Sequence, residues 1–219
     1  MADVLHNRRT RTPKPVPLAA SQIDEAGKVL AQAFNDDPLA AYMLPKEEDR
    51  AVLLPAHFIA VVKYGLLSGE VWTTEGRVEG VSVWLPPGRL EMNPVRMHEA
   101  GFDELPSIIG FDAVQRFTEF FQYLEPIHKR DVQAEHWYAM VIGVAPESQG
   151  RGIGDSLLQP VLTRADLEGV PCYLETVQPT NVSFYRKHGF EVIVEEVEPR
   201  SRLRFWTFRR DPKRLKDNK

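Results

Sequence analysis

The stretch from Val144 to Gly154 limits the folds open to this chain more than any other. It reads Val-Ala-Pro-Glu-Ser-Gln-Gly-Arg-Gly-Ile-Gly and lies between an apolar run and an amphipathic run. That order predicts a strand, a glycine-rich turn and the start of a helix. A helix N-terminus carries unpaired backbone N–H groups and a partial positive charge, so it attracts phosphate. We therefore expect this turn to hold a phosphorylated ligand.

Two common phosphate-binding turns do not fit this stretch. A P-loop has a lysine directly after its last glycine, and no lysine follows here. A dinucleotide fold has Gly-x-Gly-x-x-Gly early in its domain, whereas these glycines alternate as Gly150-x-Gly152-x-Gly154 two-thirds of the way along the chain. The turn therefore indicates another class of phosphorylated ligand.

The hydrophobic pattern predicts an α/β fold with a mixed sheet and antiparallel strands at both ends. Apolar residues recur at helical spacing in 48–67, 111–124, 150–168 and 181–187. Runs typical of strands lie at 16–19, 70–74, 78–85, 137–144, 172–176, 192–197 and 203–208. We expect one domain over residues 16–210, a flexible basic arm at 1–15 and a basic tail at 211–219. Residues 89–134 form a helical insertion that we expect to cover an acceptor site.

Charge is distributed unevenly along the 219 residues. Residues 1–16 carry a net charge of +3 and residues 209–219 a net charge of +4, which leaves −11 for the body of the chain. An acidic body favours a cationic substrate over nucleic acid, although ordinary surface acidity also accounts for the count. The N-terminus has no apolar signal core, and no apolar run approaches the ~20 residues that cross a bilayer. With Cys172 as the only cysteine, we expect a cytoplasmic protein without membrane partners.

With its neighbours, the glycine turn resembles the pyrophosphate motif of the GCN5-related (GNAT) N-acetyltransferases. That motif is Gln/Arg-x-x-Gly-x-Gly/Ala after a strand ending in Val-x-Pro, and this chain has Gln149-x-x-Gly152-x-Gly154 after Val-Ala-Pro. A second block, from Asn181 to Phe190, is similar to the family's last motif. Segments 34–38, 84–88 and 171–176 resemble the puromycin N-acetyltransferase branch.

The resemblance implies a sheet of six or seven strands whose central pair splays apart to form a slot for acyl-CoA. It places a bulge at Gly143 and pairs that strand with the pantetheine arm like an added strand. Acetyl-CoA is the implied co-substrate, with Arg151 adding a charged contact to a phosphate. No metal site is expected, because the histidines lack ligand spacing. The residues implied to hold the co-substrate are Ile142, Gly143, Val144, Gln149, Gly150, Arg151, Gly152, Ile153, Gly154, Asn181 and Tyr185.

Tyr185 and Glu175 are the residues that we expect to carry the chemistry. A phenol can donate a proton to the departing thiolate, which is the role implied for Tyr185. The amine arrives as an ammonium ion and must lose a proton, and Glu175 is the first candidate base. Glu135, His136 or a water molecule stay open as alternatives. For the acceptor site, the candidate lining residues are Phe34, Tyr42, Trp84 and the face from Phe111 to Phe121.

The sequence therefore predicts an acetyl-CoA-dependent N-acetyltransferase. It moves an acetyl group to a primary amine of a small cationic molecule by direct attack in a ternary complex. An aminonucleoside-type antibiotic fits the puromycin-like features. A protein or peptide acceptor and a non-catalytic acyl-CoA sensor stay open as alternatives, and edge strands of such a sheet leave a homodimer open.

Overall fold

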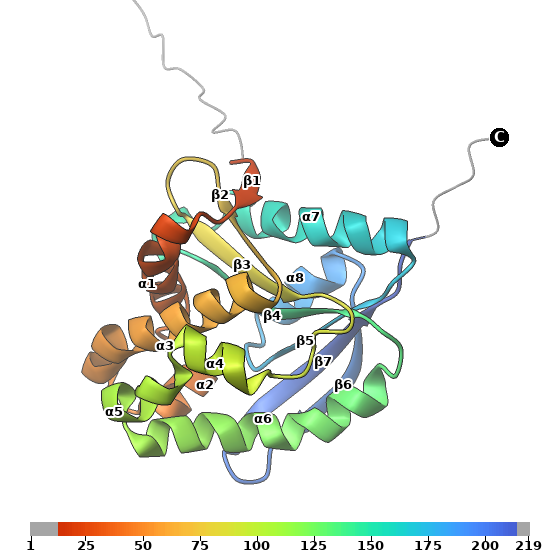
Figure 1. The fold of residues 1–219 in the computed structure, drawn as a ribbon. Helices are drawn as coiled ribbons and strands as arrows, with labels where there is room; N and C mark the ends of the chain where they lie inside the picture. Colours follow the sequence, from red (N-terminus) through yellow and green to blue (C-terminus); the bar gives the residue numbers. More distant parts are fainter. Residues whose placement is uncertain (1–12, 214–219) are drawn as a thin grey trace, which may run out of the picture.

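The computed structural model describes residues 13–213, so most of the predicted arm and tail (1–12 and 214–219) lies outside it. The described chain forms one seven-stranded sheet with helices on both faces (Figure 1). The strands are β1 (Pro15–Pro17), β2 (Glu70–Thr74), β3 (Gly80–Leu85), β4 (Trp137–Val144), β5 (Cys172–Thr176), β6 (Glu191–Val197) and β7 (Arg204–Arg210). The α-helices are α1 (Ile23–Ala33), α2 (Pro38–Met43), α3 (Glu47–Ser68), α4 (Pro94–Ala100), α5 (Leu105–Ile109), α6 (Phe111–Asp131), α7 (Ile153–Glu168) and α8 (Asn181–Lys187).

The sheet has the strand order β1-β2-β3-β4-β5-β7-β6. Every neighbouring pair is antiparallel except β4 and β5, which run parallel. A parallel pair needs a crossover connection, and here α7 supplies it. The predicted mixed, mostly antiparallel sheet is confirmed, with antiparallel strands at both ends.

Alternation along the strands sends side chains into two separate cores. On β3, Val81 and Val83 pack in the cluster formed with α1 and α3, whereas Trp84 packs with residues of α7 and β5 on the other face. Ser82 also points toward α7, where its hydroxyl donates to the Leu157 carbonyl at 3.2 Å. The sheet is therefore a central layer, with α1 and α3 on one face and α7 on the other (Figure 1).

The long helix α3 confirms the helix predicted at 48–67. Its length and composition would also let it cross a membrane, and in residues 13–213 it is the one helix with that property. This helix is an exception to the expectation that no apolar run approaches a membrane-crossing length. Half of its most apolar window is buried, and its Leu54, Phe58 and Val62 pack in the core cluster with α1 and β3. In this fold α3 is thus a core helix.

The segment 89–134 is helical, as predicted, and α6 is its main element. Phe120, Leu124 and Ile127 of α6 form a small core with Val194 of β6 and Phe205 of β7. This packing sets α6 across the C-terminal half of the sheet (Figure 1). One face of α6 is thereby held beside the point where the central strands part.

Candidate functional site

The central strands β4 and β5 part shortly after they begin. They pair in parallel at only two positions, where Trp137 and Tyr138 face Cys172 and Tyr173. Beyond those positions β4 continues along β3 and β5 continues along β7. The two strand edges therefore diverge, and the inner edge of β4 can accept an extended ligand as an added strand. The predicted splayed pair is confirmed.

A bulge in β4 lies at Met140, so the prediction of a bulge at Gly143 is wrong. The consecutive β3 residues Val83–Trp84 pair with Val141 and Ala139, which leaves Met140 as the extra residue. A bulge bends a strand and increases its twist. Met140 therefore marks where β4 turns away from β5.

Gly143 is glycine because α1 lies against it. It pairs regularly with β3, and a Cβ atom built on it would lie 2.9 Å from Leu30 Cδ2, 3.0 Å from Ala33 Cβ and 3.1 Å from Phe34 Cε2. Contacts that short leave no space for a side chain. The residue thus fixes how closely α1 approaches the slot.

The glycines of the turn before α7 have two different functions. Gly150 and Gly152 have φ values of +74° and +77°, a region that favours glycine. Gly154 lies inside the first helical turn, where a Cβ would lie 3.2 Å from Phe184 of α8. The Ser156 N–H donates to the Gly152 carbonyl, and the helix offers the preceding amides no carbonyl four residues back. The turn therefore presents amides at a helix N-terminus, as predicted.

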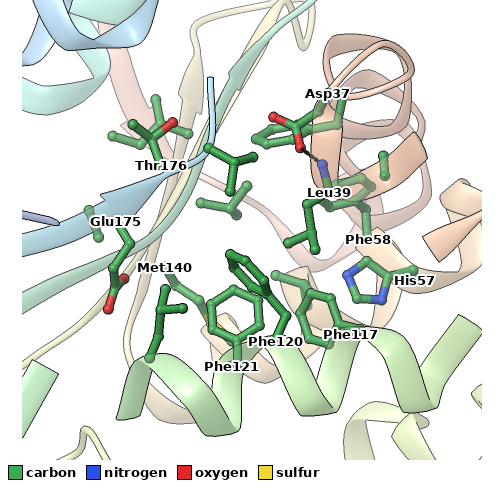
Figure 2. Close-up of a pocket in the computed structure, with 18 of the residues that line it drawn as sticks. Asp37, Leu39, His57, Phe58, Phe117, Phe120, Phe121, Met140, Glu175 and Thr176 are labelled. Carbon is green, nitrogen blue, oxygen red and sulfur yellow. Dashed lines mark hydrogen bonds between the residues drawn. The ribbon is translucent and has the colours of Figure 1, made fainter. Parts of the chain in front are cut away.

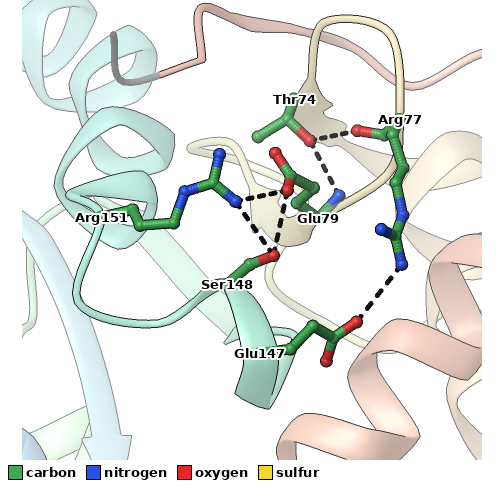
Figure 3. Close-up of polar contacts among 6 residues, drawn as sticks. All are labelled: Thr74, Arg77, Glu79, Glu147, Ser148 and Arg151. Carbon is green, nitrogen blue, oxygen red and sulfur yellow. Dashed lines mark hydrogen bonds and ion pairs between the residues drawn. The ribbon is translucent and has the colours of Figure 1, made fainter. Parts of the chain in front are cut away.

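Arg151 is held by an acidic partner on the β2–β3 connection (Figure 3). Its Nη1 donates to Glu79 Oε1 at 2.6 Å, and the Ser148 hydroxyl donates to the same oxygen at 3.0 Å. The Arg151 hydrogen bond is the main cause that lowers the pKa of Glu79. Beside it, the exposed Arg77 and Glu147 form a second bridge of 3.3 Å between the same two loops. The network ties the glycine turn to the neighbouring hairpin, and a phosphate contact of Arg151 stays a prediction.

The other predicted ligand residues lie along one path from the turn to the slot. The Gln149 side chain donates to the Val144 carbonyl at 3.2 Å, which folds the turn back on the end of β4. Ile153 is buried, whereas Ile142 lines the cavity described next. Asn181 is the first residue of α8 and donates to the Thr176 hydroxyl at 3.5 Å. The structure thus brings these predicted residues together beside the parted strands.

A cavity of about 280 Å³ lies between the parted strands and the helices α2, α3 and α6 (Figure 2). From β5 and α8, the polar side chains of Glu175, Thr176, Asn181 and Tyr185 line it. The remaining wall is mostly apolar, with phenylalanines of α3 and α6 projecting into the space (Figure 2). The cavity therefore joins the residues predicted to carry the chemistry to an apolar wall, whose phenylalanines are Phe34, Phe58, Phe102, Phe117, Phe120, Phe121 and Phe205.

The aromatic residues expected at an acceptor site divide into two groups. Phe34 and the inner face of α6 line the cavity. Trp84 does not, because it is fully buried in the core with α7. Tyr42 lines a separate polar hollow with Glu119 and Arg200, and Phe111 is 68% exposed. These three predictions are wrong, since tertiary packing sends the three side chains elsewhere.

Tyr185 is a buried phenol that lines the cavity. Its ring packs against Phe190 and Phe208, with centroid distances of 5.9 and 5.5 Å. Burial, followed by the nearby Asp37 carboxylate, raises the pKa of Tyr185 far above its usual range. The hydroxyl therefore stays protonated at neutral pH, as a proton donor must.

Glu175 is a buried carboxyl group on β5, and its side chain is only 8% exposed. Burial raises its pKa from 4.5 to about 8, while a hydrogen bond from the Tyr138 hydroxyl lowers it and the nearby Asp131 carboxylate raises it further. A pKa near the working pH suits a group that accepts and then releases a proton. Glu175 therefore combines a place in the cavity lining with a pKa close to neutral pH.

The two other candidate bases do not reach the cavity. Glu135 is exposed on the loop before β4. His136 is 3% exposed, and its two ring nitrogens lie 2.7 Å from the Ala134 carbonyl and 2.7 Å from His128 Nε2. Of the three candidates, Glu175 is the one that lines the cavity.

Three ionisable residues near the cavity were not predicted from the sequence. Asp37 caps α2 by accepting the Leu39 N–H at 2.9 Å, and burial raises its pKa to about 6. His57 is buried against Phe117, and burial lowers its pKa to about 4. His128 lies beside Glu175, with 3.4 Å between Nδ1 and Oε1. Of these three residues, only Asp37 has a local sequence signal, the Asp-Pro pair that begins a helix. The two histidines reach the site through tertiary packing.

Cys172 offers no nucleophile. Burial raises the pKa of its thiol to about 12, so the reactive thiolate is scarce at neutral pH. In the part of the chain that the structure describes, no three histidine, cysteine or carboxylate side chains gather where they could hold a metal ion. The chemistry available at the site is proton transfer around Glu175 and Tyr185.

Comparisons with known proteins agree with this geometry. Residues 107–192 match the acetyltransferase (GNAT) domain model. The chain is 28% identical over 177 residues to an uncharacterized N-acetyltransferase of Schizosaccharomyces pombe, a match that covers 78% of this chain and 71% of the relative.

Two solved structures share the fold. One is the histone acetyltransferase HPA2 and related acetyltransferase of Corynebacterium glutamicum, with a TM-score of 0.67, 20% identity, and coverage of 94% of this chain and 99% of that one. The other is arylalkylamine N-acetyltransferase 2 of Aedes aegypti, with a TM-score of 0.62, 13% identity, and coverage of 91% and 99%. At these identities the likeness concerns the fold.

Proposed function

We propose that this chain, whose residues 107–192 match the acetyltransferase (GNAT) domain model, acetylates the primary amine of a small molecule whose body is apolar. The cavity carries this proposal, since its lining combines a candidate base and a candidate acid with several phenylalanines. Acetyl-CoA supplies the acetyl thioester on which the amine acts. Every step that the protein adds is binding, orientation or proton transfer.

The residues present fit acetyl-CoA. The inner edge of β4 diverges from β5 and can pair with the amide groups of the pantetheine arm. The turn around Gly150 and Gly152 presents amides and the positive end of α7 to a pyrophosphate. Asn181 lies between these two features and lines the cavity. These residues would hold the co-substrate with its thioester toward Glu175 and Tyr185.

Glu175 acts first on the bound acceptor. A primary amine is mostly ammonium at neutral pH and has no lone pair to attack a carbonyl. When Glu175 is ionised, its carboxylate takes one proton from the nitrogen, and the neutral amine then bonds to the thioester carbonyl carbon.

Tyr185 acts on the other side of the reaction. As the C–S bond breaks, the sulfur leaves as a thiolate and takes the hydroxyl proton of Tyr185. The ammonium gives up two protons in all. One proton replaces that of Tyr185, and the other goes to solvent. The products are the acetamide and free CoA.

The walls of the cavity select the acceptor. Phe117, Phe120 and Phe121 of α6 provide an apolar surface of the size of a ring or a short alkyl chain (Figure 2). Asp37 lies across the cavity from Glu175 and offers a second carboxyl group to an ammonium (Figure 2). An amine with an aromatic or aliphatic body fits this arrangement better than a polyamine does, because apolar wall is covered by apolar surface.

The test is release of free CoA from acetyl-CoA with a panel of amines. The apolar members are phenylethylamine, tyramine and hexylamine, and the polar members are spermidine, an aminoglycoside and a lysine peptide; puromycin is included for the puromycin-like features. We expect the apolar amines to have kcat/KM at least about ten-fold above the polar ones, equivalent to about 1.4 kcal/mol of differential binding.

Two variants are measured with the same panel of amines, one as a test and one as a control. Phe121→Ala should weaken the binding of phenylethylamine, measured as a higher KM, and leave the acetyl-CoA affinity unchanged. Ser183→Ala, an exposed position on α8, is the matched surface control. Turnover of spermidine alone would refute the apolar acceptor, and a wild-type protein that fails to bind acetyl-CoA would refute the proposed function as a whole.

A further inference from the structure

Two histidines continue from Glu175 in a chain of short contacts. His128 of α6 lies with Nδ1 3.4 Å from Glu175 Oε1, and its Nε2 lies 2.7 Å from Nε2 of His136. His136 Nδ1 lies 2.7 Å from the Ala134 carbonyl oxygen. Neither histidine lines the cavity. The contacts therefore lead away from the acceptor and toward the loop before β4.

The Ala134 carbonyl sets the proton positions along this chain. A carbonyl can only accept, so His136 must carry its hydrogen on Nδ1. In a neutral His136 the Nε2 atom is then an acceptor, and His128 must donate to it from its own Nε2. A neutral His128 consequently has a bare lone pair on Nδ1, the nitrogen that lies 3.4 Å from Glu175 Oε1.

We propose that His128 receives the proton that Glu175 takes from the amine and releases it to solvent, while His136 holds His128 in the required tautomer. This inference rests on the proposed function. His128 is 19% exposed against 8% for Glu175, so it gives the buried carboxyl group a way out to water. In these terms Glu175 is the catalytic base, His128 is a relay and His136 is a positioning residue.

The protons balance over one reaction cycle. Glu175–COO⁻ takes H⁺ from the ammonium and becomes Glu175–COOH. The acid O–H donates to Nδ1 of His128, which becomes an imidazolium ion and then loses a proton to water. The carboxylate and the neutral imidazole are regenerated, and the released proton is the one that acetamide formation produces. No further reactant is needed.

The surroundings keep His128 neutral at rest. The Tyr173 ring stacks on it at 4.0 Å and the Tyr138 ring lies at 5.0 Å. Burial, followed by the neighbouring His136, lowers the pKa of His128 to about 4, whereas Glu125 raises it and Lys129 lowers it. The proton therefore resides on Glu175 and crosses His128 only briefly, as in a relay. Burial lowers the pKa of His136, the nearby Glu135 raises it and Arg209 lowers it.

The first test is the pH dependence of kcat/KM for His128→Asn, measured with the best amine of the panel. We expect a loss of about 10- to 100-fold at pH 7, at or below the lower limit of the roughly 10²- to 10⁴-fold typical of direct general acid–base catalysis. The deficit should shrink as the pH approaches the pKa of the free amine, because the acceptor then arrives neutral. Added imidazole should restore part of the activity at pH 7. The KM for acetyl-CoA should stay unchanged.

The matched control is His98→Asn. His98 also faces a carboxylate, Asp103 at 2.8 Å, but this pair is exposed on the surface. This variant should have the wild-type pH profile. A His128→Asn deficit that is equal at every pH and insensitive to imidazole would show a structural role and overturn the relay.

A second test needs no acceptor and so separates the relay from the proposed function. Long-range ¹H–¹⁵N spectra of the whole protein at pH 7 report the tautomer of each histidine. We expect the hydrogen on Nε2 of His128 and on Nδ1 of His136. A hydrogen on Nδ1 of His128 would overturn the relay even if the amine panel shows turnover. Conversely, an inactive wild type with the expected tautomers would refute the proposed function while supporting the relay geometry.

Discussion

Glu175 should make the folded protein less stable as the pH rises. Its pKa is raised from 4.5 to about 8, chiefly because burial disfavours the carboxylate. A carboxyl group with a raised folded-state pKa stabilises fully below its unfolded pKa, and that stability is lost as the pH rises through the folded pKa. At about 1.4 kcal/mol per pH unit, the raised pKa of Glu175 costs about 3 kcal/mol of stability at pH 7 and about 5 kcal/mol above pH 8.

Glu175→Gln removes this cost and keeps the shape of the side chain. We expect the free energy of unfolding of the variant to exceed that of the wild type by up to about 3 kcal/mol at pH 7, and by less than about 1 kcal/mol at pH 5. In a chain of this length, 3 kcal/mol corresponds to a rise in Tm of about 6–12 °C. The same variant should lose about 10²- to 10⁴-fold in kcat/KM, because the base is gone.

Thermal and urea unfolding between pH 5 and pH 9 measure the effect. Asp37 also has a raised pKa, about 6, but it is present in both proteins and cancels in the difference. The matched control is Glu191→Gln, an exposed position on the edge strand β6. A stability gain of Glu175→Gln that is the same at pH 5 and pH 8 would refute burial of the charge as its cause.

Three further variants test other parts of the site and its support. Tyr185→Phe should lower kcat by about 10²- to 10³-fold with unchanged Tm and acetyl-CoA affinity, because only the proton donor is lost; equal loss in affinity by titration calorimetry would contradict that role. Gly152→Ala should cost about 1–2 kcal/mol at φ +77° and weaken acetyl-CoA binding in the same calorimetric assay. Arg210→Met should cost about 3–5 kcal/mol in urea unfolding, since it leaves Asp166 without the two hydrogen bonds, 2.8 and 2.7 Å, that the nearly buried guanidinium donates.

The local elements of the site were predictable because their signals are short in sequence. A strand, alternating glycines and an amphipathic helix follow one another within residues 137–168, and backbone geometry alone makes that order a helix N-terminus with free amides. The same holds for β5, which has Glu175 near its end, and for α8, which begins at Asn181 and carries Tyr185 one turn later. The predicted splayed pair came from the family resemblance.

The position of the bulge in β4 could not be predicted from the sequence. Glycine is common at bulges, which made Gly143 the natural choice, but a glycine is also placed wherever another element packs too closely for a side chain. The approach of α1 decides between these uses, and no local pattern encodes it. In the structure α1 takes the space beside Gly143, and the extra residue is Met140.

The sequence by itself determined the order of elements and the glycine turn at the start of α7, because each depends on residues close together in the chain. Only the tertiary structure decided what surrounds them. Packing of α6 against the sheet brings His128 to Glu175 and sets three phenylalanines around the cavity, over separations of dozens of residues. Burial then raises the pKa of Glu175, and burial is a property of the folded whole that no single segment carries.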